Sequence, residues 1–435
     1  MVTRKRATLA IASVAALALS LGACGSTGDN KASSGSGVEL QMVESLTNPD
    51  RTKLIRSLLD EFEAANPDIK VKLVSPPTEQ ADNKIQQMLQ SGSGVDVLEV
   101  RDLTVGPFSN NGWLYDMSAD LESWEGFKNL TPNAQLVSKA SDGKSYFIPY
   151  GFYGLSLFYR VDLIEKAGFD KAPHSWQDLL EQSKKIQNPD ENTYGYAFRG
   201  AKNSIGQMAA CIEAFVGDNL DIQNSYFTKD GATIFSTPEA KQAVELYLEL
   251  FKNGSPPSSV NWGYPEMVDG FKTGMTAFLL QDPEVIATIR SDSNLVEGTQ
   301  WTTTPLLVGP TGKAAQPIAT AGWGVAQNSK HHEQAVKLVQ FLSGDASTTF
   351  AKENNLIPIL TTASEDEYYK TGPWAAYVSM SEDTSTYMAV TEPRSSKHWS
   401  EWMDKTYTEI QAVLVGSMTS DDMLASWDTF WKDKK

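Results

Sequence analysis

The chain has 435 residues, of which 41% are hydrophobic and 21% charged, a composition that excludes a disordered protein and suits two or three folded domains. Asp and Glu number 54 against 37 Lys and Arg, and the net charge of −17 argues against a nucleic-acid partner, because phosphates are repelled. With two cysteines and four histidines, we expect no disulfide framework, no metal site and no cofactor.

The first segment is typical of a secretory signal. Residues 1–6 carry three positive charges, an apolar run rich in Ala and Leu follows over 7–21, and small residues precede Cys24. The apolar run is shorter than the ~20 residues that a membrane-spanning helix needs. We therefore predict a signal peptide over residues 1–23 and a protein that works outside the cell.

The four residues ending at Cys24, Leu-Gly-Ala-Cys, resemble the lipobox of bacterial lipoproteins. The resemblance implies that Cys24 carries lipid and anchors the protein to the membrane; the alternative is an ordinary signal peptide with a chance cysteine. Residues 25–37 are rich in Gly and Ser, so segment 24–37 is interpreted as the lipidated cysteine and a flexible tether of about 20 Å. Cys211 then has no partner and is expected to be a small buried hydrophobic residue.

Strand-like and helical segments alternate from residue 38 onward. Strands are predicted at 38–43, 69–74 and 95–100, with helices at 51–65 and 81–90 between them. In the first helix, apolar residues recur at helical spacing until Asn66-Pro67 ends the pattern. This β-α-β-α-β order predicts a mostly parallel sheet with helices on both faces.

The rest of the chain predicts a second unit of the same α/β class. Further strands are expected at 145–149, 156–159, 276–280 and 324–326, and helices at 238–253, 332–343 and around 410–415. No internal repeat or long linker divides the chain, so two lobes must share it by crossing segments. We expect a first lobe of 38–149 plus 302–345 and a second of 150–301 plus 346–435. Ligands of open α/β sheets bind at the carboxyl ends of strands, so a cleft is expected between the lobes.

The sequence carries no recognisable catalytic motif. It has no phosphate-binding loop, no dinucleotide fingerprint, no zinc-protease pair and no nucleophile elbow. His331 and His332 lie in a polar stretch that predicts the start of a helix. A glycosidase needs only two suitably placed carboxylates, so this class stays open as an alternative, although we expect no enzyme and no catalytic residue.

Aromatic residues are the more unusual signal. The chain has 11 Trp, 15 Tyr and 17 Phe, and many stand beside Gly, Pro or Asn, as in Trp262-Gly263-Tyr264, Gly322-Trp323-Gly324 and the pair Trp399 and Trp402. A flat ring covers the apolar face of a sugar, while carboxylates, amides and Arg bind its hydroxyl groups. Each buried ring contributes ~1.5–3 kcal/mol, so two or three rings with a few hydrogen bonds suffice for micromolar affinity.

Several segments in one order carry a family resemblance. They are 146–150 (YFIPY), 157–168 (LFYRVDLIEKAG), 271–278 (FKTGMTAF) and 321–326 (AGWGVA). Together they resemble the extracytoplasmic oligosaccharide-binding proteins of ABC importers, the group that includes maltodextrin-binding proteins. The resemblance implies a monomer with two periplasmic-binding-protein-like lobes, joined by a hinge of crossing segments and closing on a ligand. It also implies delivery of that ligand to a membrane permease.

The resemblance also implies where the ligand binds. Contacts are expected after the first strand, after the third strand, after the Pro149 crossover, in the loop after Leu280 and near the C-terminus. Many members have an aromatic residue in that loop, where this chain has Glu284. Trp262 or Trp323 could supply the missing stacking surface instead. The candidate ligand-binding residues are Glu44, Arg101, Asp102, Tyr153, Trp262, Asp282, Glu284, Trp323 and Trp402.

These observations lead to one hypothesis with alternatives. An acidic chain with many rings and few histidines fits an uncharged, polyhydroxylated ligand, so we predict an extracellular, lipid-anchored receptor for a neutral oligosaccharide. An amino sugar, a glycerol-phosphate ester or a polyamine is the alternative among binding proteins, and an extracellular glycosidase is the alternative among enzymes.

Overall fold

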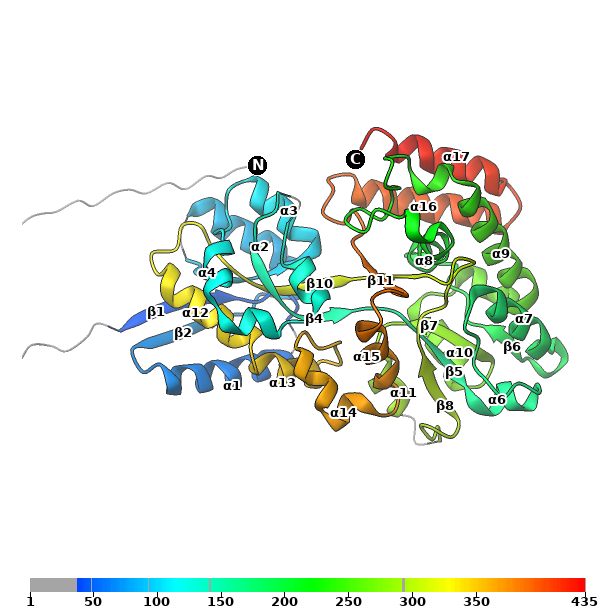
Figure 1. Cartoon of the computed structure of the whole chain (residues 1–435), viewed down its shortest axis with the longest axis horizontal. Helices are drawn as coiled ribbons and strands as arrows, with labels where there is room; N and C mark the ends of the chain where they lie inside the picture. Colours follow the sequence, from blue (N-terminus) through cyan, green and yellow to red (C-terminus); the bar gives the residue numbers. More distant parts are fainter. Residues whose placement is uncertain (1–36, 48, 93, 141, 292–293, 435) are drawn as a thin grey trace, which may run out of the picture. The chain divides into compact units, whose positions relative to one another are not determined.

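The structure is a computed structural model that describes residues 37–47, 49–92, 94–140, 142–291 and 294–434 (Figure 1). The predicted signal peptide over 1–23, the lipidation site Cys24 and residues 25–36 of the tether lie outside the described residues. Among the described residues, none of the helices combines the length and the apolar character that a membrane crossing requires.

The first sheet has five strands in the order β2-β1-β3-β10-β4. They are β1 (Val38–Val43), β2 (Ile69–Val74), β3 (Val97–Arg101), β4 (Phe147–Tyr153) and β10 (Ala319–Val325). Strand β1 is parallel to β2 and β3, whereas β10 is antiparallel to β3 and β4. The predicted alternation of strands and helices is confirmed for β1, β2 and β3.

Helices cover this sheet on both faces. Those of the first lobe are α1 (Pro49–Ala65), α2 (Thr78–Ser91), α3 (Asp102–Asn110), α4 (Ser118–Ser123), α5 (Pro132–Val137), α12 (His332–Ser343) and α13 (Ala346–Glu353). Helix α1 packs against α12 and α13, because Ile55, Leu58, Leu59 and Phe62 form one buried stripe. Helix α12 begins at His332, as the sequence predicts.

The second sheet has four strands in the order β6-β7-β5-β8. They are β5 (Ser156–Arg160), β6 (Tyr194–Tyr196), β7 (Thr276–Gln281) and β8 (Trp301–Thr304). Its helices are α6 (Val161–Lys166), α7 (Trp176–Ile186), α8 (Ser204–Val216), α9 (Pro238–Gly254), α10 (Tyr264–Lys272), α11 (Val285–Arg290), α14 (Glu367–Lys370), α15 (Trp374–Glu382), α16 (Trp399–Leu414) and α17 (Ser420–Trp431). A small parallel pair, β9 (Ala314–Pro317) with β11 (Tyr387–Val390), completes the strands.

Short 3-10 helices lie between these elements, at Glu125–Asn129, Pro189–Glu191, Gly217–Asn219, Ile234–Ser236, Pro257–Asn261 and Thr361–Glu365. Cys211 is a free, fully buried thiol on α8, which confirms its predicted role as a small hydrophobic residue. Burial raises the pKa of this thiol, so Cys211 is chemically quiet.

The α/β class, the two-lobed architecture and the mostly parallel sheets are confirmed, with one strand of opposite direction in each sheet: β10 in the first and β5 in the second. In the second sheet β6 and β7 are paired in parallel, while β5 is antiparallel to β7 and β8. The reason is connectivity. The chain passes from the first sheet to the second between β4 and β5 and returns between β8 and β10, and a crossing segment need not run in the direction of a β-α-β unit.

Strand pairing also moves the expected edges of the lobes. Residues 150–153 extend β4 in the first sheet, and 302–304 belong to β8 in the second. Helix α13 packs against α1 and β4 of the first lobe. These segments lie on the other side of the crossings from where the sequence assigned them, because hydrogen bonding between strands far apart in sequence decides membership.

Candidate functional site

A cavity of about 430 Å3 lies among the segments that connect the two sheets. Its wall includes Leu103 of α3, Tyr153 at the end of β4, Arg199 between β6 and α8, and Asp282 just after β7. The segment after β11 contributes Glu392 and Arg394, and α16 contributes Trp399. The volume lies within the ~300–1,000 Å3 of small-molecule sites, and strand ends are the expected place for one.

One part of this wall is rigidly held. Gln207 on α8 accepts hydrogen bonds at Oε1 from the hydroxyls of Tyr196 (2.9 Å) and Tyr247 (3.3 Å). Its Nε2 donates to the carbonyl oxygen of Leu280 at 2.7 Å. All four residues are buried. The amide of Gln207 is therefore fixed by its hydrogen bonds and holds the start of α8 against the end of β7.

Gln281 is the neighbouring wall residue, and its amide is only half satisfied. Its Oε1 accepts a hydrogen bond from the backbone N–H of Asp282 at 3.1 Å. Its Nε2 is buried and has no hydrogen-bond partner within the described residues. A buried donor without an acceptor costs roughly 1–3 kcal/mol, so the amide of Gln281 is less completely satisfied than that of Gln207 beside it.

Arg199 and Asp282 line the same cavity, and no ion pair joins them in the described part of the chain. The guanidinium of Arg199 donates from Nε to the carbonyl oxygen of Lys202 at 3.0 Å. Burial lowers the pKa of Arg199, although the charge of Asp282 opposes this. Burial likewise raises the pKa of Asp282 to about 6. Both charges are thus partly shielded from water, and neither has an ion-pair partner within the described residues.

A second acid of the wall, Glu392, has a buried acidic neighbour behind it. Glu392 accepts a hydrogen bond from the Tyr226 hydroxyl at 3.2 Å, and the fully buried Glu213 is its electrostatic neighbour. Burial raises the pKa of both carboxyl groups, and their mutual repulsion raises that of Glu213 further. Burial thus disfavours the charged form of both carboxyl groups on this side of the cavity.

Two aromatic side chains reach the cavity. Trp399 at the start of α16 and Tyr153 at the end of β4 both line it. Trp399 lies 5.9 Å from the ring of Tyr226, and the guanidinium carbon of Arg394 lies 6.0 Å from the Trp399 ring. These contacts hold the indole in place, so one face is backed by protein.

Tyr153 also lines a second, smaller cavity of about 280 Å3. The other lining residues are Leu46, Arg51, Glu284 and Asn354. Burial raises the pKa of Glu284 to about 7, and the nearby charge of Asp282 adds to the shift. A molecule longer than the first cavity would pass Tyr153 and meet these groups.

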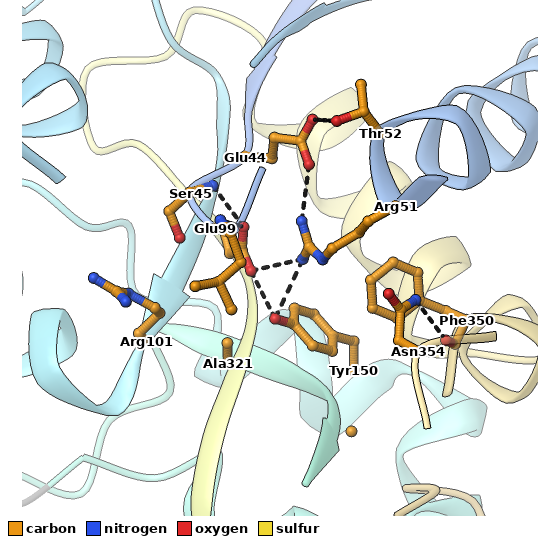
Figure 2. Close-up of polar contacts among 12 residues, drawn as sticks. Glu44, Ser45, Arg51, Thr52, Glu99, Arg101, Tyr150, Ala321, Phe350 and Asn354 are labelled. Atoms are coloured by element: carbon orange, nitrogen blue, oxygen red, sulfur yellow. Dashed lines mark hydrogen bonds and ion pairs between the residues drawn. The ribbon is translucent and has the colours of Figure 1, made fainter. Parts of the chain in front are cut away.

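Arg51, on the wall of the second cavity, is the centre of an ion-pair network (Figure 2). Arg51 bonds Glu44 at 2.8 Å and Glu99 at 2.7 Å, and the Tyr150 hydroxyl donates to Glu99 at 2.6 Å. Glu99 also accepts from the backbone N–H of Ser45 at 2.6 Å. Burial lowers the pKa of Arg51, but the two carboxylates more than offset this, so the net pKa lies above its usual value.

Comparison with known proteins gives this geometry a context. The sequence pattern of the bacterial extracellular solute-binding proteins matches residues 48–349. The chain belongs to this family. Its membership confirms the predicted resemblance and confirms that the protein is a binding protein rather than an enzyme. The glycosidase alternative is therefore not retained, and neither cavity needs a catalytic carboxylate pair.

Relatives within the family differ in the solutes named for them. The galactooligosaccharide-binding protein of Bacillus subtilis is 25% identical over 357 residues, or 81% of this chain and 80% of that protein. The mannitol-binding protein of Pseudomonas aeruginosa is 24% identical over 319 residues, 71% and 70% of the two chains. The maltose-bound structure of T. maritima MalE3 has a TM-score of 0.71 at 22% identity, covers 91% of this chain and all of that chain, and shows the same fold.

The structure brings together only some of the residues that the sequence proposed for this solute-binding protein. Tyr153 and Asp282 line the first cavity, and Tyr153 and Glu284 line the second. Glu44 is fully buried in the ion pair with Arg51. Arg101 pairs with Asp82 and lies outside the dashed network of Figure 2. Glu44 and Arg101 are therefore not among the residues lining either cavity.

Asp102 and the three tryptophans also lie elsewhere than expected. Asp102 forms an ion pair with Arg394 at 3.0 Å and does not line either cavity. Trp323 is 1% exposed, Trp402 is 0% exposed and Trp262 is 9% exposed. The prediction that these rings floor the cleft is wrong for Trp323 and Trp402, which pack in the two lobe cores. Trp262 packs against Gly270, where a Cβ would lie 2.9 Å from the indole.

The glycines beside Trp323 explain why the sequence placed this ring in the cleft when it is in fact buried. A Cβ on Gly322 would lie 2.0 Å from the carbonyl oxygen of Ile148, and one on Gly324 would lie 2.6 Å from that of Tyr146. Gly is therefore required because β4 approaches β10 closely, not because the ring faces an open cleft. Trp323 instead packs on Tyr150, with ring centroids 5.3 Å apart.

Several cavity residues were missed by sequence reasoning. They are Arg199, Gln207, Gln281, Glu392, Arg394 and Trp399. Gln281 directly precedes the predicted Asp282 at the end of a predicted strand, and Trp399 belongs to the flagged pair in which Trp402 was chosen. The other four follow strands or begin helices that carry no distinctive motif. No cluster of potential metal ligands occurs among the described residues.

Proposed function

We propose that this protein captures a neutral oligosaccharide in the first cavity, extends it past Tyr153, and delivers it to the permease of an ABC importer. The observation that carries the proposal is that Arg199 and Asp282, a guanidinium and a carboxylate, line one cavity without forming an ion pair with each other. A sugar hydroxyl both donates and accepts, so adjacent hydroxyls satisfy both groups.

A charged ligand fits this wall less well. An anion would meet Asp282 and Glu392, and a cation would meet Arg199 and Arg394. Hydrogen bonds between a neutral group and a charged one contribute about 1.5–3 kcal/mol each. A polyhydroxylated neutral molecule gains these bonds without placing a like charge beside either group. Among the alternatives, an amino sugar or polyamine is thus disfavoured by the arginines and a phosphate ester by the acids.

Ring stacking and length favour a sugar of more than one unit. Trp399 offers the broad apolar surface that a sugar face needs, on the wall that also carries Arg394. Tyr153 is shared by both cavities, so it would contact two neighbouring units. A linear polyol, the kind of ligand named for the Pseudomonas relative, fits the first cavity alone and is the second candidate.

Several further features belong to the same proposal. The two lobes close on the ligand by a hinge at the β4–β5 and β8–β10 crossings, as ligand-closing receptors do. The proposed lobes keep most of the predicted ranges, 38–149 plus 302–345 and 150–301 plus 346–435, but 150–153 and α13 are counted in the first lobe and 302–304 in the second. A signal peptide over 1–23, a lipid on Cys24 and a monomeric state complete the proposed receptor on the outer face of the cell membrane.

A panel of solutes tests the ligand class. The protein is heated with mono-, di- and trisaccharides, linear polyols, uronic acids and amino sugars. We expect neutral di- or trisaccharides to raise the melting temperature most, because a ligand of the native state adds RT ln(1 + [L]/Kd) to stability. Calorimetry on the same solutes gives Kd. A response to polyols alone supports the second candidate, and a response to charged sugars alone contradicts the proposal.

A further inference from the structure

An ion pair joins two segments that belong to different lobes. Asp102 begins α3, which packs on β3 and β10 of the first sheet. Arg394 follows β11. Three residues earlier, the backbone of Thr391 forms hydrogen bonds with the backbones of Ile222 and Ser225 in the second lobe. The Arg394 Nε and the Asp102 Oδ2 lie 3.0 Å apart. This contact therefore spans the gap that a hinge motion would open.

The two charged groups depend on each other. The Asp102 side chain is 18% exposed and that of Arg394 is 30% exposed. The Arg394 Nε and the Asp102 Oδ2 have no hydrogen-bond partner besides this ion pair within the described residues. Burial raises the pKa of Asp102, and the charge of Arg394 opposes the shift. Separating the segments would leave each group to be rehydrated alone.

A second observation shows that the same two segments are in tight contact. A Cβ on Gly106, one turn along α3, would lie 2.9 Å from the Cβ of Ser395. Only a residue without a side chain therefore lets α3 come this close to the segment that carries Arg394. The ion pair and the glycine contact are adjacent, so they form one patch between the lobes.

We propose that Asp102 and Arg394 form a latch that holds the two lobes together and positions the guanidinium of Arg394 on the wall of the first cavity. Asp102 is then a positioning residue that acts through Arg394 without contacting the ligand itself. Arg394 lines the cavity beside Glu392 and above Trp399, so closing the latch also completes the binding wall. The inference rests on the proposed hinge motion, but not on the identity of the ligand.

Charge reversal tests the latch without any ligand. Asp102→Arg places two guanidinium groups face to face, so the share of closed molecules that the ligand-free protein samples should fall, with the closed-to-open ratio dropping about 10-fold or more. Small-angle scattering measures this as a larger radius of gyration than that of the unmutated protein. The double variant Asp102→Arg with Arg394→Asp restores the pair with opposite polarity and is expected to return the radius to the original value.

Matched controls separate the latch from a general effect of charge. Asp82→Asn removes the ion-pair partner of Arg101, the residue just before Asp102. Because this ion pair lies within the first lobe, the substitution is expected to leave the radius of gyration unchanged. Gly106→Ala is expected to open the protein without altering any charge. Circular dichroism of every variant verifies folding.

Two outcomes overturn the inference. One is an unchanged radius in both Asp102→Arg and Gly106→Ala. The other is an expansion in Asp102→Arg that the double variant does not reverse, since the expansion would then not arise from the pair. Neither outcome depends on sugar binding, which the solute panel measures separately. A failed latch is therefore distinguishable from a failed ligand proposal.

Discussion

Two polar clusters in this molecule are built from the same residue types and differ in how completely they are paired. In the first lobe, Arg51 is enclosed by Glu44, Glu99 and Tyr150, each within 3.3 Å of it or of one another. In the first cavity, Arg199 and Asp282 face the same space without contact. A completed ion-pair network indicates a role in folding, whereas partly desolvated charges without an ion-pair partner indicate a role in binding.

Two tryptophans differ in the same way, one being buried in the first lobe and the other lining the first cavity. Trp323 is buried beside Tyr150 and Phe350, under the Arg51 network. Trp399 is partly exposed and lines the cavity. Each indole lies about 6.0 Å from an arginine, so the neighbouring cation does not distinguish them. Access to the cavity does, and it gives the two rings different expected mutant phenotypes.

The largest expected effect is the loss of the first cluster. Arg51→Met leaves Glu44 and Glu99 buried without their cation, and breaking a buried pair in this way costs about 3–5 kcal/mol of unfolding free energy. Chemical denaturation measures the loss. Arg199→Met is the matched control, because Arg199 makes no ion pair in the described part of the chain. Equal destabilisation by both substitutions would contradict the division into a folding cluster and a binding cluster.

The two tryptophans should show a similar separation. Trp323→Ala is expected to cost about 3–5 kcal/mol in unfolding free energy, as for other buried aromatic residues. Trp399→Ala is expected to change stability much less and to weaken sugar binding by about 10-fold or more, since it removes a stacking surface. Calorimetric titration and denaturation of both variants provide the test. A stable Trp323→Ala protein with impaired binding would reverse the assignment.

The cavity charges should affect binding more than folding. Asp282→Asn removes an acceptor for a ligand hydroxyl, and Arg199→Gln removes charged donors. Each is expected to raise Kd by about 10- to 100-fold, the equivalent of one hydrogen bond to a charged group. The unfolding free energy of the ligand-free protein should stay the same or rise, because a desolvated charge is removed. Unchanged affinity in both variants would exclude this wall as the binding site.

A smaller effect should appear as a dependence of stability on pH. The pKa of Asp282 is about 6 in the folded protein against an ordinary 3.8. Between these values the native state binds more protons than the unfolded state, so the unfolding free energy falls as pH rises from about 4 to 6. Asp282→Asn should flatten that slope in denaturation series at pH 4, 5, 6 and 7.

Glu284 supplies the matched control for the pH measurement. Its pKa is raised from 4.5 to about 7. The stability that its protonated form contributes is therefore lost between about pH 4.5 and 7, a range that ends at a higher pH than that of Asp282. Glu284→Gln should remove the decline between pH 6 and 7 and make that between about 4.5 and 6 shallower, leaving the part that Asp282 contributes. A slope that neither variant changes would mean that other groups titrate there.

Sequence reasoning reached the fold more fully than the site. Strands β1 and β2 were predicted at their observed bounds, and helix α12 likewise, because alternation and helical periodicity are local properties. Of the nine proposed ligand residues, Tyr153, Asp282 and Glu284 line a cavity. Tyr153 ends β4, and Asp282 and Glu284 lie in the loop after β7, so their position in the fold can be inferred from the chain.

The rest of the site depended on contacts between distant segments. Arg199, Gln281 and Glu392 come together from three parts of the chain, and nothing local marks their convergence. Glu44 was a reasonable candidate at the end of β1 until Arg51, on the next helix, proved to neutralise it. Trp323 carried the flanking glycines of an exposed ring but needed them for strand packing.

The sequence by itself therefore determined the α/β class, the succession of elements and the absence of catalytic motifs, since these depend on composition and on periodicity over a few residues. Only the tertiary structure decided which acids are neutralised, which rings are covered and which donors remain free. The physical reason is that burial and pairing are properties of a residue's neighbours in space. In a chain that crosses between two sheets, those neighbours are often more than a hundred residues away, as with Arg394 and Asp102.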